Sequence, residues 1–102
     1  MKRNFWLVLM LSGPLTAPAL ADQALATSKA CMACHAVDKK VVGPAFKDVA
    51  RKYANTKDAP GALAIKIVKG SSGVWGAVPM PANAQVSEAD AKKLAAWVLS
   101  LK

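Results

Sequence analysis

The stretch Cys31-Met32-Ala33-Cys34-His35 decides what this chain can bind and how it must fold. On a helix, Cys31, Cys34 and His35 occupy positions i, i+3 and i+4, so both thiols and the imidazole share one face. A structural disulfide would close a very short loop and would not require the neighbouring histidine. A thioredoxin-like dithiol requires a βαβ scaffold, and structural zinc requires four ligands where this chain has 2 Cys and 1 His.

The remaining interpretation of the motif is attachment of a c-type haem, for which Cys-x-x-Cys-His is the signature. Its spacing lets two thiols add to the two vinyl groups along one porphyrin edge, while the adjacent imidazole binds iron. We predict one covalently bound haem c, attached through Cys31 and Cys34, with His35 as an axial iron ligand. The haem would also supply apolar volume to a domain that is too small to build a large core of its own.

The N-terminus has the layout of a secretory signal peptide. Lys2 and Arg3 precede an unbroken apolar run from Phe5 to Leu11, and Ala19-Leu20-Ala21 is a small-residue cleavage site. The run is too short to span a bilayer, and no other stretch of the sequence is long enough. We predict a cleaved leader over residues 1–21, a monohaem domain over residues 22–102 and a periplasmic location.

The second axial ligand follows by elimination. The chain has no second histidine, and two of its 4 methionines leave with the leader. Met32 lies between the cysteines and cannot reach the opposite face of the haem. Met80 remains, in a segment where Pro79 and Pro81 stiffen the backbone and upstream glycines permit close approach to a ring. We predict Met80 as the second axial ligand, with lysine as the alternative at high pH.

Outside these motifs the chain has helical spacing and no strand period. Ser87 is a good N-cap, Asp58 can cap the helix that runs to Lys69, and Gly70 suits the position just after a helix end. The predicted helices cover Asp22 to about Lys29, Phe46–Tyr53, the residues from Asp58 to Lys69, and those from Ser87 to about Leu101, with an irregular loop over Gly70–Val86.

The chain is basic, with 14 Lys and Arg against 6 Asp and Glu and a formal net charge of +8. Because an exported protein does not ordinarily meet nucleic acid, this charge indicates either acidic protein partners or simply a soluble basic surface. We expect redox proteins with acidic docking surfaces as partners, no nucleic acid, no stable membrane insertion and a monomeric state.

Four segments resemble a known family. They are Cys31-Met32-Ala33-Cys34-His35, Val42-Gly43-Pro44-Ala45-Phe46-Lys47-Asp48-Val49-Ala50, Gly73-Val74-Trp75-Gly76-Ala77-Val78-Pro79-Met80-Pro81 and Trp97-Val98-Leu99-Ser100. The chain is similar to the small class I cytochromes c of the c-551 (c8) type from Gram-negative bacteria over nearly all of residues 22–102. The resemblance implies an all-α fold of about four short helices wrapped around one covalently attached, low-spin haem.

The resemblance also implies roles for residues around the haem. The Pro44 carbonyl would accept a hydrogen bond from the His35 ring and fix the imidazole. Trp75 would donate its indole N–H to a haem propionate. Asn83 would hydrogen-bond near the Met80 sulfur.

The chain departs from the family pattern in two places. Lys66 stands where relatives often carry an arginine that touches a propionate, and lysine cannot make a bidentate contact. The stretch Asn83-Ala84-Gln85-Val86 is one residue longer than usual.

Filled axial positions favour electron transfer over catalysis, because iron then has no open site for a substrate. A methionine ligand favours Fe(II) and raises the reduction potential. The resemblance implies a periplasmic shuttle that passes single electrons between respiratory partners, for example to a cytochrome cd1 nitrite reductase or a terminal oxidase. The alternative is a small haem enzyme or gas-binding haem protein with a labile distal ligand.

The expected docking surface surrounds the exposed haem edge, near the thioethers and the loop that carries Met80. Its centre should be apolar and its rim basic, because basic rims steer the encounter with acidic partners. The candidates are Val42, Ala77 and Val78 for the centre, and Lys29, Lys39, Lys40 and Lys69 for the rim.

Overall fold

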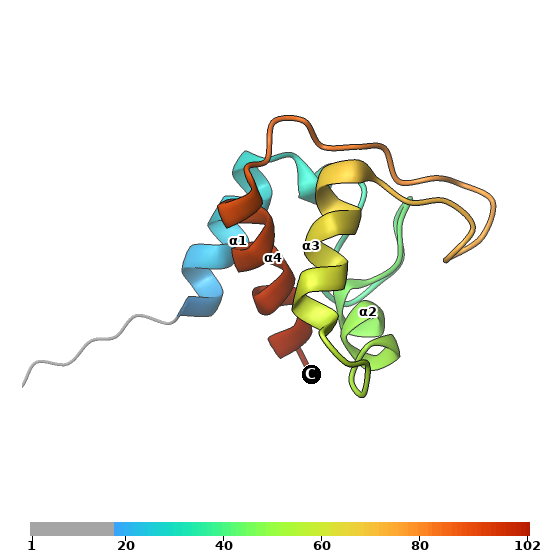
Figure 1. Ribbon diagram of the computed structural model, residues 1–102, viewed down its shortest axis with the longest axis horizontal. Coiled ribbons are helices and arrows are strands. Elements are labelled where there is room, and N and C mark those ends of the chain that lie inside the picture. Colours follow the sequence, from blue (N-terminus) through green and yellow to red (C-terminus); the bar gives the residue numbers. More distant parts are fainter. Residues whose placement is uncertain (1–17) are drawn as a thin grey trace, which may run out of the picture.

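The computed structural model describes residues 18–102, with side chains described from residue 22 onward. These residues form the α-helices α1 (Pro18–Ser28), α2 (Phe46–Lys52), α3 (Ala59–Lys69) and α4 (Glu88–Ser100), and one turn of 3-10 helix, η1 (Cys31–Ala33) (Figure 1). The described residues hold no strand, only two isolated bridges, between His35 and Lys40 and between Ser71 and Met80. The predicted all-α class is therefore confirmed.

Helix α4 packs against the other three α-helices and forms the centre of the fold (Figure 1). Its buried stripe contains Leu94, Trp97 and Val98, at positions i, i+3 and i+4, which share one face of a helix. Ser87 caps the helix as predicted, because its hydroxyl accepts a hydrogen bond from the Asp90 N–H at 3.1 Å.

Two helix starts differ from the prediction. Helix α1 begins at Pro18, ahead of the expected cleavage after Ala21, whereas the rest of the predicted leader, residues 1–17, lies outside the described residues. Asp58 precedes α3 as predicted, but its side chain makes no capping hydrogen bond. Its φ of 56° is left-handed, whereas a capping side chain normally starts from an extended backbone. The carboxylate lies over Gly61 instead.

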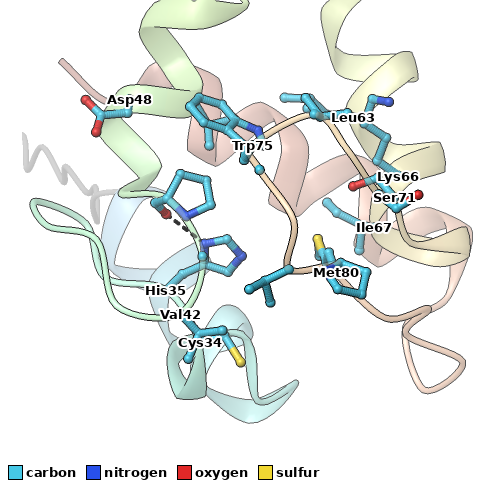
Figure 2. Close-up of a pocket in the computed structure, with 18 of the residues that line it drawn as sticks. Cys34, His35, Val42, Asp48, Leu63, Lys66, Ile67, Ser71, Trp75 and Met80 are labelled. Atoms are coloured by element: carbon cyan, nitrogen blue, oxygen red, sulfur yellow. Dashed lines mark hydrogen bonds between the residues drawn. The ribbon is translucent and has the colours of Figure 1, made fainter.

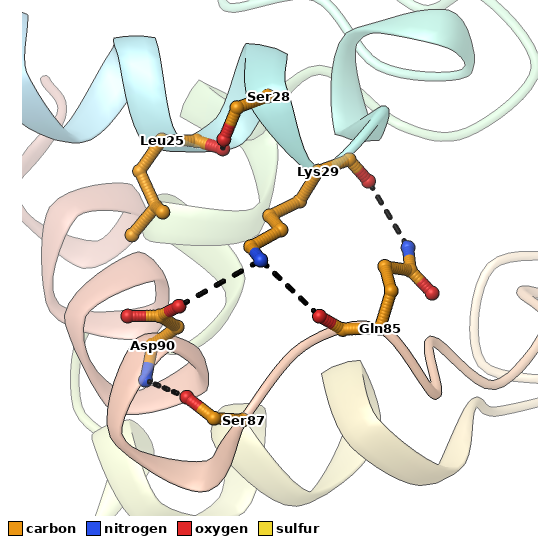
Figure 3. Close-up of polar contacts among 6 residues, drawn as sticks. All are labelled: Leu25, Ser28, Lys29, Gln85, Ser87 and Asp90. Carbon is orange, nitrogen blue, oxygen red and sulfur yellow. Dashed lines mark hydrogen bonds and ion pairs between the residues drawn. The ribbon is translucent and has the colours of Figure 1, made fainter.

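A polar cluster joins the end of α1 to the segment before α4 (Figure 3). The Lys29 ammonium donates to the Gln85 carbonyl at 3.2 Å and lies 3.9 Å from the Asp90 carboxylate. In return, the Gln85 amide donates to the Lys29 carbonyl at 3.1 Å. Lys29 therefore helps to join α1 to α4, and the Asp90 carboxylate partly neutralises its charge. This differs from the prediction, in which Lys29 was a free lysine on the rim of the docking surface.

The core is thin. Among the described residues, no large apolar side chain is completely buried; Leu94 and Trp97 come nearest, with 2% and 3% of their surface exposed. Alanines fill much of the contact between helices, including Ala26, Ala91 and Ala95. A domain with so few large buried groups needs an additional source of stability.

Candidate haem site

A cavity of about 380 Å³ opens between the helices and the segment that follows α3. Its volume falls within the range of about 300–1,000 Å³ that is typical of ligand and cofactor sites. Apolar groups dominate the lining, and Figure 2 shows how its side chains converge from both sides. The lining includes Cys34, His35, Val42, Gly43, Pro44, Phe46, Val49, Leu63, Lys66, Ile67, Trp75, Met80 and Val98.

Both cysteines are free thiols on one helical turn. The Cys34 N–H donates to the Cys31 carbonyl at 3.2 Å, which is the bond of a 3-10 turn, and the His35 N–H donates to the same carbonyl at 3.1 Å. Cys34 lines the large cavity, while Cys31 lines an adjoining space of about 30 Å³ together with His35 and Met80. Burial raises the pKa of the Cys31 thiol, and a backbone hydrogen bond partly opposes this.

One ring nitrogen of His35 is fixed by the backbone. Its Nδ1 lies 2.8 Å from the carbonyl oxygen of Pro44, and because a carbonyl can only accept, Nδ1 must carry the proton. This is the contact that the resemblance implied. The tautomer leaves the lone pair of Nε2 free for a metal. Figure 2 shows the imidazole directed into the cavity toward Met80.

Gly43 allows the backbone to pass directly against this imidazole. A Cβ at position 43 would lie 2.5 Å from Cε1 of His35, a distance that no real contact reaches. Any side chain there would displace either the ring or the loop. Gly43 had no predicted role, although a glycine just before Pro44 indicates a close approach of the backbone to another group.

Met80 lies on the other side of the cavity (Figure 2). Its backbone pairs with Ser71 in both directions, with N···O distances of 3.0 and 2.8 Å. Gly70 has a φ of 79°, and a Cβ there would lie 2.6 Å from the Met80 carbonyl oxygen. The loop is therefore closed at its base by backbone contacts that do not depend on the Met80 side chain.

Asn83 supports the same loop. Its amide nitrogen donates to the carbonyl of Ile67 at 2.8 Å and lies 3.4 Å from that of Pro81. Its backbone N–H donates to the Val68 carbonyl at 3.1 Å. The last carbonyls of α3 have no partner within the helix, and Asn83 satisfies two of them.

Trp75 and Lys66 both line the cavity on the side away from the cysteines (Figure 2). Trp75 keeps 41% of its surface exposed, and the Lys52 ammonium lies 5.4 Å from the centre of its ring. This cation–π contact connects α2 to the Met80 loop, and no sequence pattern indicated it.

The apolar side chains expected in the docking surface are exposed. Val42 and Val78 line the cavity and leave 52% and 63% of their surface exposed, and Ala77 is exposed beside them. Lys39, Lys40 and Lys69 are exposed as well.

Among residues 18–102, no group of three His, Cys, Asp or Glu side chains is placed to hold a metal ion. Over the same residues, no helix combines the length and the apolar character needed to cross a membrane.

Known proteins provide independent evidence. A profile described as Cytochrome c matches residues 20–102. Cytochrome c-552 of Nitrosomonas europaea is 61% identical over 84 residues, which is 82% of either chain. Cytochrome c-551 of Stutzerimonas stutzeri is 53% identical over 105 residues, covering 100% of both chains. The crystal structure of wild-type Nitrosomonas europaea cytochrome c552 superposes with a TM-score of 0.77 at 60% identity, covering 78% of this chain and 99% of that one.

The cavity fits the group that these relatives carry. It is apolar, Cys34 lines it while Cys31 of the same turn lines the adjoining space, and an imidazole with a free Nε2 enters it. The predicted haem c and the resemblance to the c-551 type are confirmed, and the relatives are electron carriers rather than enzymes. This chain belongs to the cytochrome c family and is a haem c electron-transfer protein.

Proposed function

We propose that the protein is a periplasmic one-electron carrier whose haem iron is bound by His35 and Met80. The observation that carries this proposal is that the two side chains face each other across the cavity from separately anchored loops (Figure 2). A haem held by His35 and Met80 would leave a substrate no open place on its iron. It would supply reversible Fe(II)/Fe(III) chemistry, and a methionine ligand would favour Fe(II).

The surrounding chain contributes rigidity and an apolar environment. Pro44 holds the His35 ring, and the Ser71 bridge holds the Met80 backbone, so both candidate ligands start from anchored segments. Trp75 and Lys66 are our candidates for contacts to the haem propionates. Lys66 would act there as a single positive charge rather than as a bidentate clamp.

We propose that respiratory redox proteins with acidic docking surfaces, such as a cytochrome cd1 nitrite reductase or a terminal oxidase, bind the monomer at the cavity mouth. Val42 and Val78 supply exposed apolar contact there. Lys40 lines the same opening, and Lys39 is exposed beside it. Charged rims of this kind accelerate encounter more than they add affinity, and salt screens them.

Reversing the charge of Lys39 and Lys40 together, as Lys39→Glu with Lys40→Glu, is expected to slow electron transfer to an acidic redox protein. Loss of electrostatic steering should lower the second-order rate by about tenfold or more at low salt, and the difference should shrink as ionic strength rises. Stopped-flow kinetics over a series of salt concentrations measures this, while the visible spectrum should remain that of the wild type.

The matched control is Lys92→Glu with Lys93→Glu, which makes the same charge change at an exposed adjacent pair on α4 that does not line the cavity. It should lower the rate much less. If both double variants lower the rate equally, net charge governs docking instead. If the wild-type rate does not change with salt concentration, apolar contact governs it.

We also propose that residues 1–21 direct export and are then removed. Cleavage after Ala21 would trim the first turn of α1 and leave the part that holds the completely buried Ala26. The intact mass of holoprotein recovered from the periplasm should equal one haem plus the chain from Asp22. A retained leader would contradict this proposal.

A further inference from the structure

Phe46, the first residue of α2, lies flat against the His35 imidazole. The two ring centres are 4.6 Å apart and the ring planes differ by 20°. Phe46 is itself nearly buried, with 7% of its surface exposed. Its ring meets Trp97 of α4 edge to face, with centres 5.4 Å apart and an interplanar angle of 74°. The three rings are therefore in continuous contact from the cavity to the central helix, one pair stacked and the other edge to face.

The hydrogen bond to Pro44 cannot by itself fix the orientation of the imidazole. A single N–H···O contact holds one ring atom, and the ring can still tilt and rock about that contact. Gly43 approaches the Cε1 region so closely that no side chain fits there, which limits motion in that direction. Phe46 covers one face of the imidazole ring. Trp97, with only 3% of its surface exposed, packs against Phe46 and limits its movement away from His35.

We propose that Phe46 is a positioning residue that sets the plane of the His35 imidazole about its bond to iron, with Trp97 as its support. This inference rests on the proposed axial ligation by His35. The orientation matters because the π orbital of an imidazole overlaps unequally with the iron d orbitals that hold the unpaired electron in Fe(III). A rotated ring therefore redistributes spin density around the haem edge through which electrons leave.

The decisive comparison is Phe46→Leu against Phe46→Tyr, both prepared as ferric holoprotein. Leucine keeps an apolar side chain but removes the flat face, whereas tyrosine keeps the ring. Proton NMR of the four hyperfine-shifted haem methyl groups reports the spin distribution directly. We expect Phe46→Leu to change the order or the spread of these resonances, and Phe46→Tyr to restore the wild-type pattern. Trp97→Leu should produce a smaller change of the same kind.

Leu99→Ala is the control for general loosening, because Leu99 packs against the core without lining the cavity. It should lower the melting temperature and keep the wild-type methyl pattern. In ferrous protein, the shifted methyl signal of the Met80 ligand should stay in place in Phe46→Leu, which confines the effect to the histidine side. If Phe46→Leu yields no holoprotein, Phe46→Met offers a flexible, ring-free side chain that adapts to the same space.

Three outcomes would overturn the proposal: an unchanged methyl pattern in the ring-free variant, the same change in Leu99→Ala, or a simultaneous shift of the Met80 methyl signal. Failure of the proposed ligation looks different. In that case the wild-type protein itself would lack the low-spin methyl pattern and the Met80 signal, before any substitution is made.

Discussion

Replacing Met80 with alanine is expected to open the haem iron to external ligands. Ferrous wild-type protein should bind carbon monoxide slowly and weakly, because the thioether must first leave iron, whereas Met80→Ala should bind it readily. In ferric protein, the thioether-to-iron band in the near-infrared should be present in the wild type and absent from the variant. Absorption spectroscopy measures both effects.

The fold around the site should survive this substitution. The loop base is closed by the backbone bonds between Ser71 and residue 80, and the Asn83 amide holds the following segment to Ile67. None of these contacts uses the Met80 side chain. The reduction potential should fall substantially, since axial ligands tune haem potentials over about 0.8 V and a methionine ligand raises them.

Met32→Ala is the matched control, because it truncates the same kind of side chain at a half-buried position that packs against the core. It should keep the near-infrared band and continue to exclude carbon monoxide. Rapid, tight carbon monoxide binding by the wild type would mean that the second axial position is open, and the proposed electron-carrier mechanism would then be wrong.

The polypeptide without haem is expected to lose most of its helical circular dichroism and its cooperative melting transition. The cavity of about 380 Å³ would be left between helices in which no large apolar side chain from residue 22 onward is completely buried. The helices are also short, 13 residues for α4 and 7 for α2, and isolated helices below about 12–15 residues are marginal in water. A covalently bound apolar group therefore contributes to folding as well as to function.

Two haem-free proteins test this expectation together: the wild-type chain made where haem is not attached, and the variant Cys31→Ser with Cys34→Ser. Both should be largely unfolded by far-ultraviolet circular dichroism, while the holoprotein melts cooperatively. Unfolding of the serine variant alone would assign the effect to the cysteine side chains, and native-like melting of both would contradict the role given to the haem.

Local sequence was enough to predict the helical class, the haem and most helix boundaries. The Cys-x-x-Cys-His spacing determines which groups share a turn, and the Ser87 cap depends only on residues within one helical turn of it. Met80 is the proposed second ligand because composition leaves no second imidazole and no other suitably placed thioether. Such inferences are possible where the interacting groups are neighbours in the chain, or where composition leaves no alternative.

Contacts between distant segments were decided by the tertiary structure. The Asn83 amide donates to the Ile67 carbonyl because packing brings the end of α3, whose carbonyls lack partners within the helix, within its reach. The Lys29 ammonium contacts Gln85 and Asp90 because packing brings the start of α4 close to it. Phe46 is recognisable in the sequence only as a core residue. Its stacking on His35 exists because α2 and the haem-attachment turn meet at one particular distance and angle, which no short-range pattern encodes.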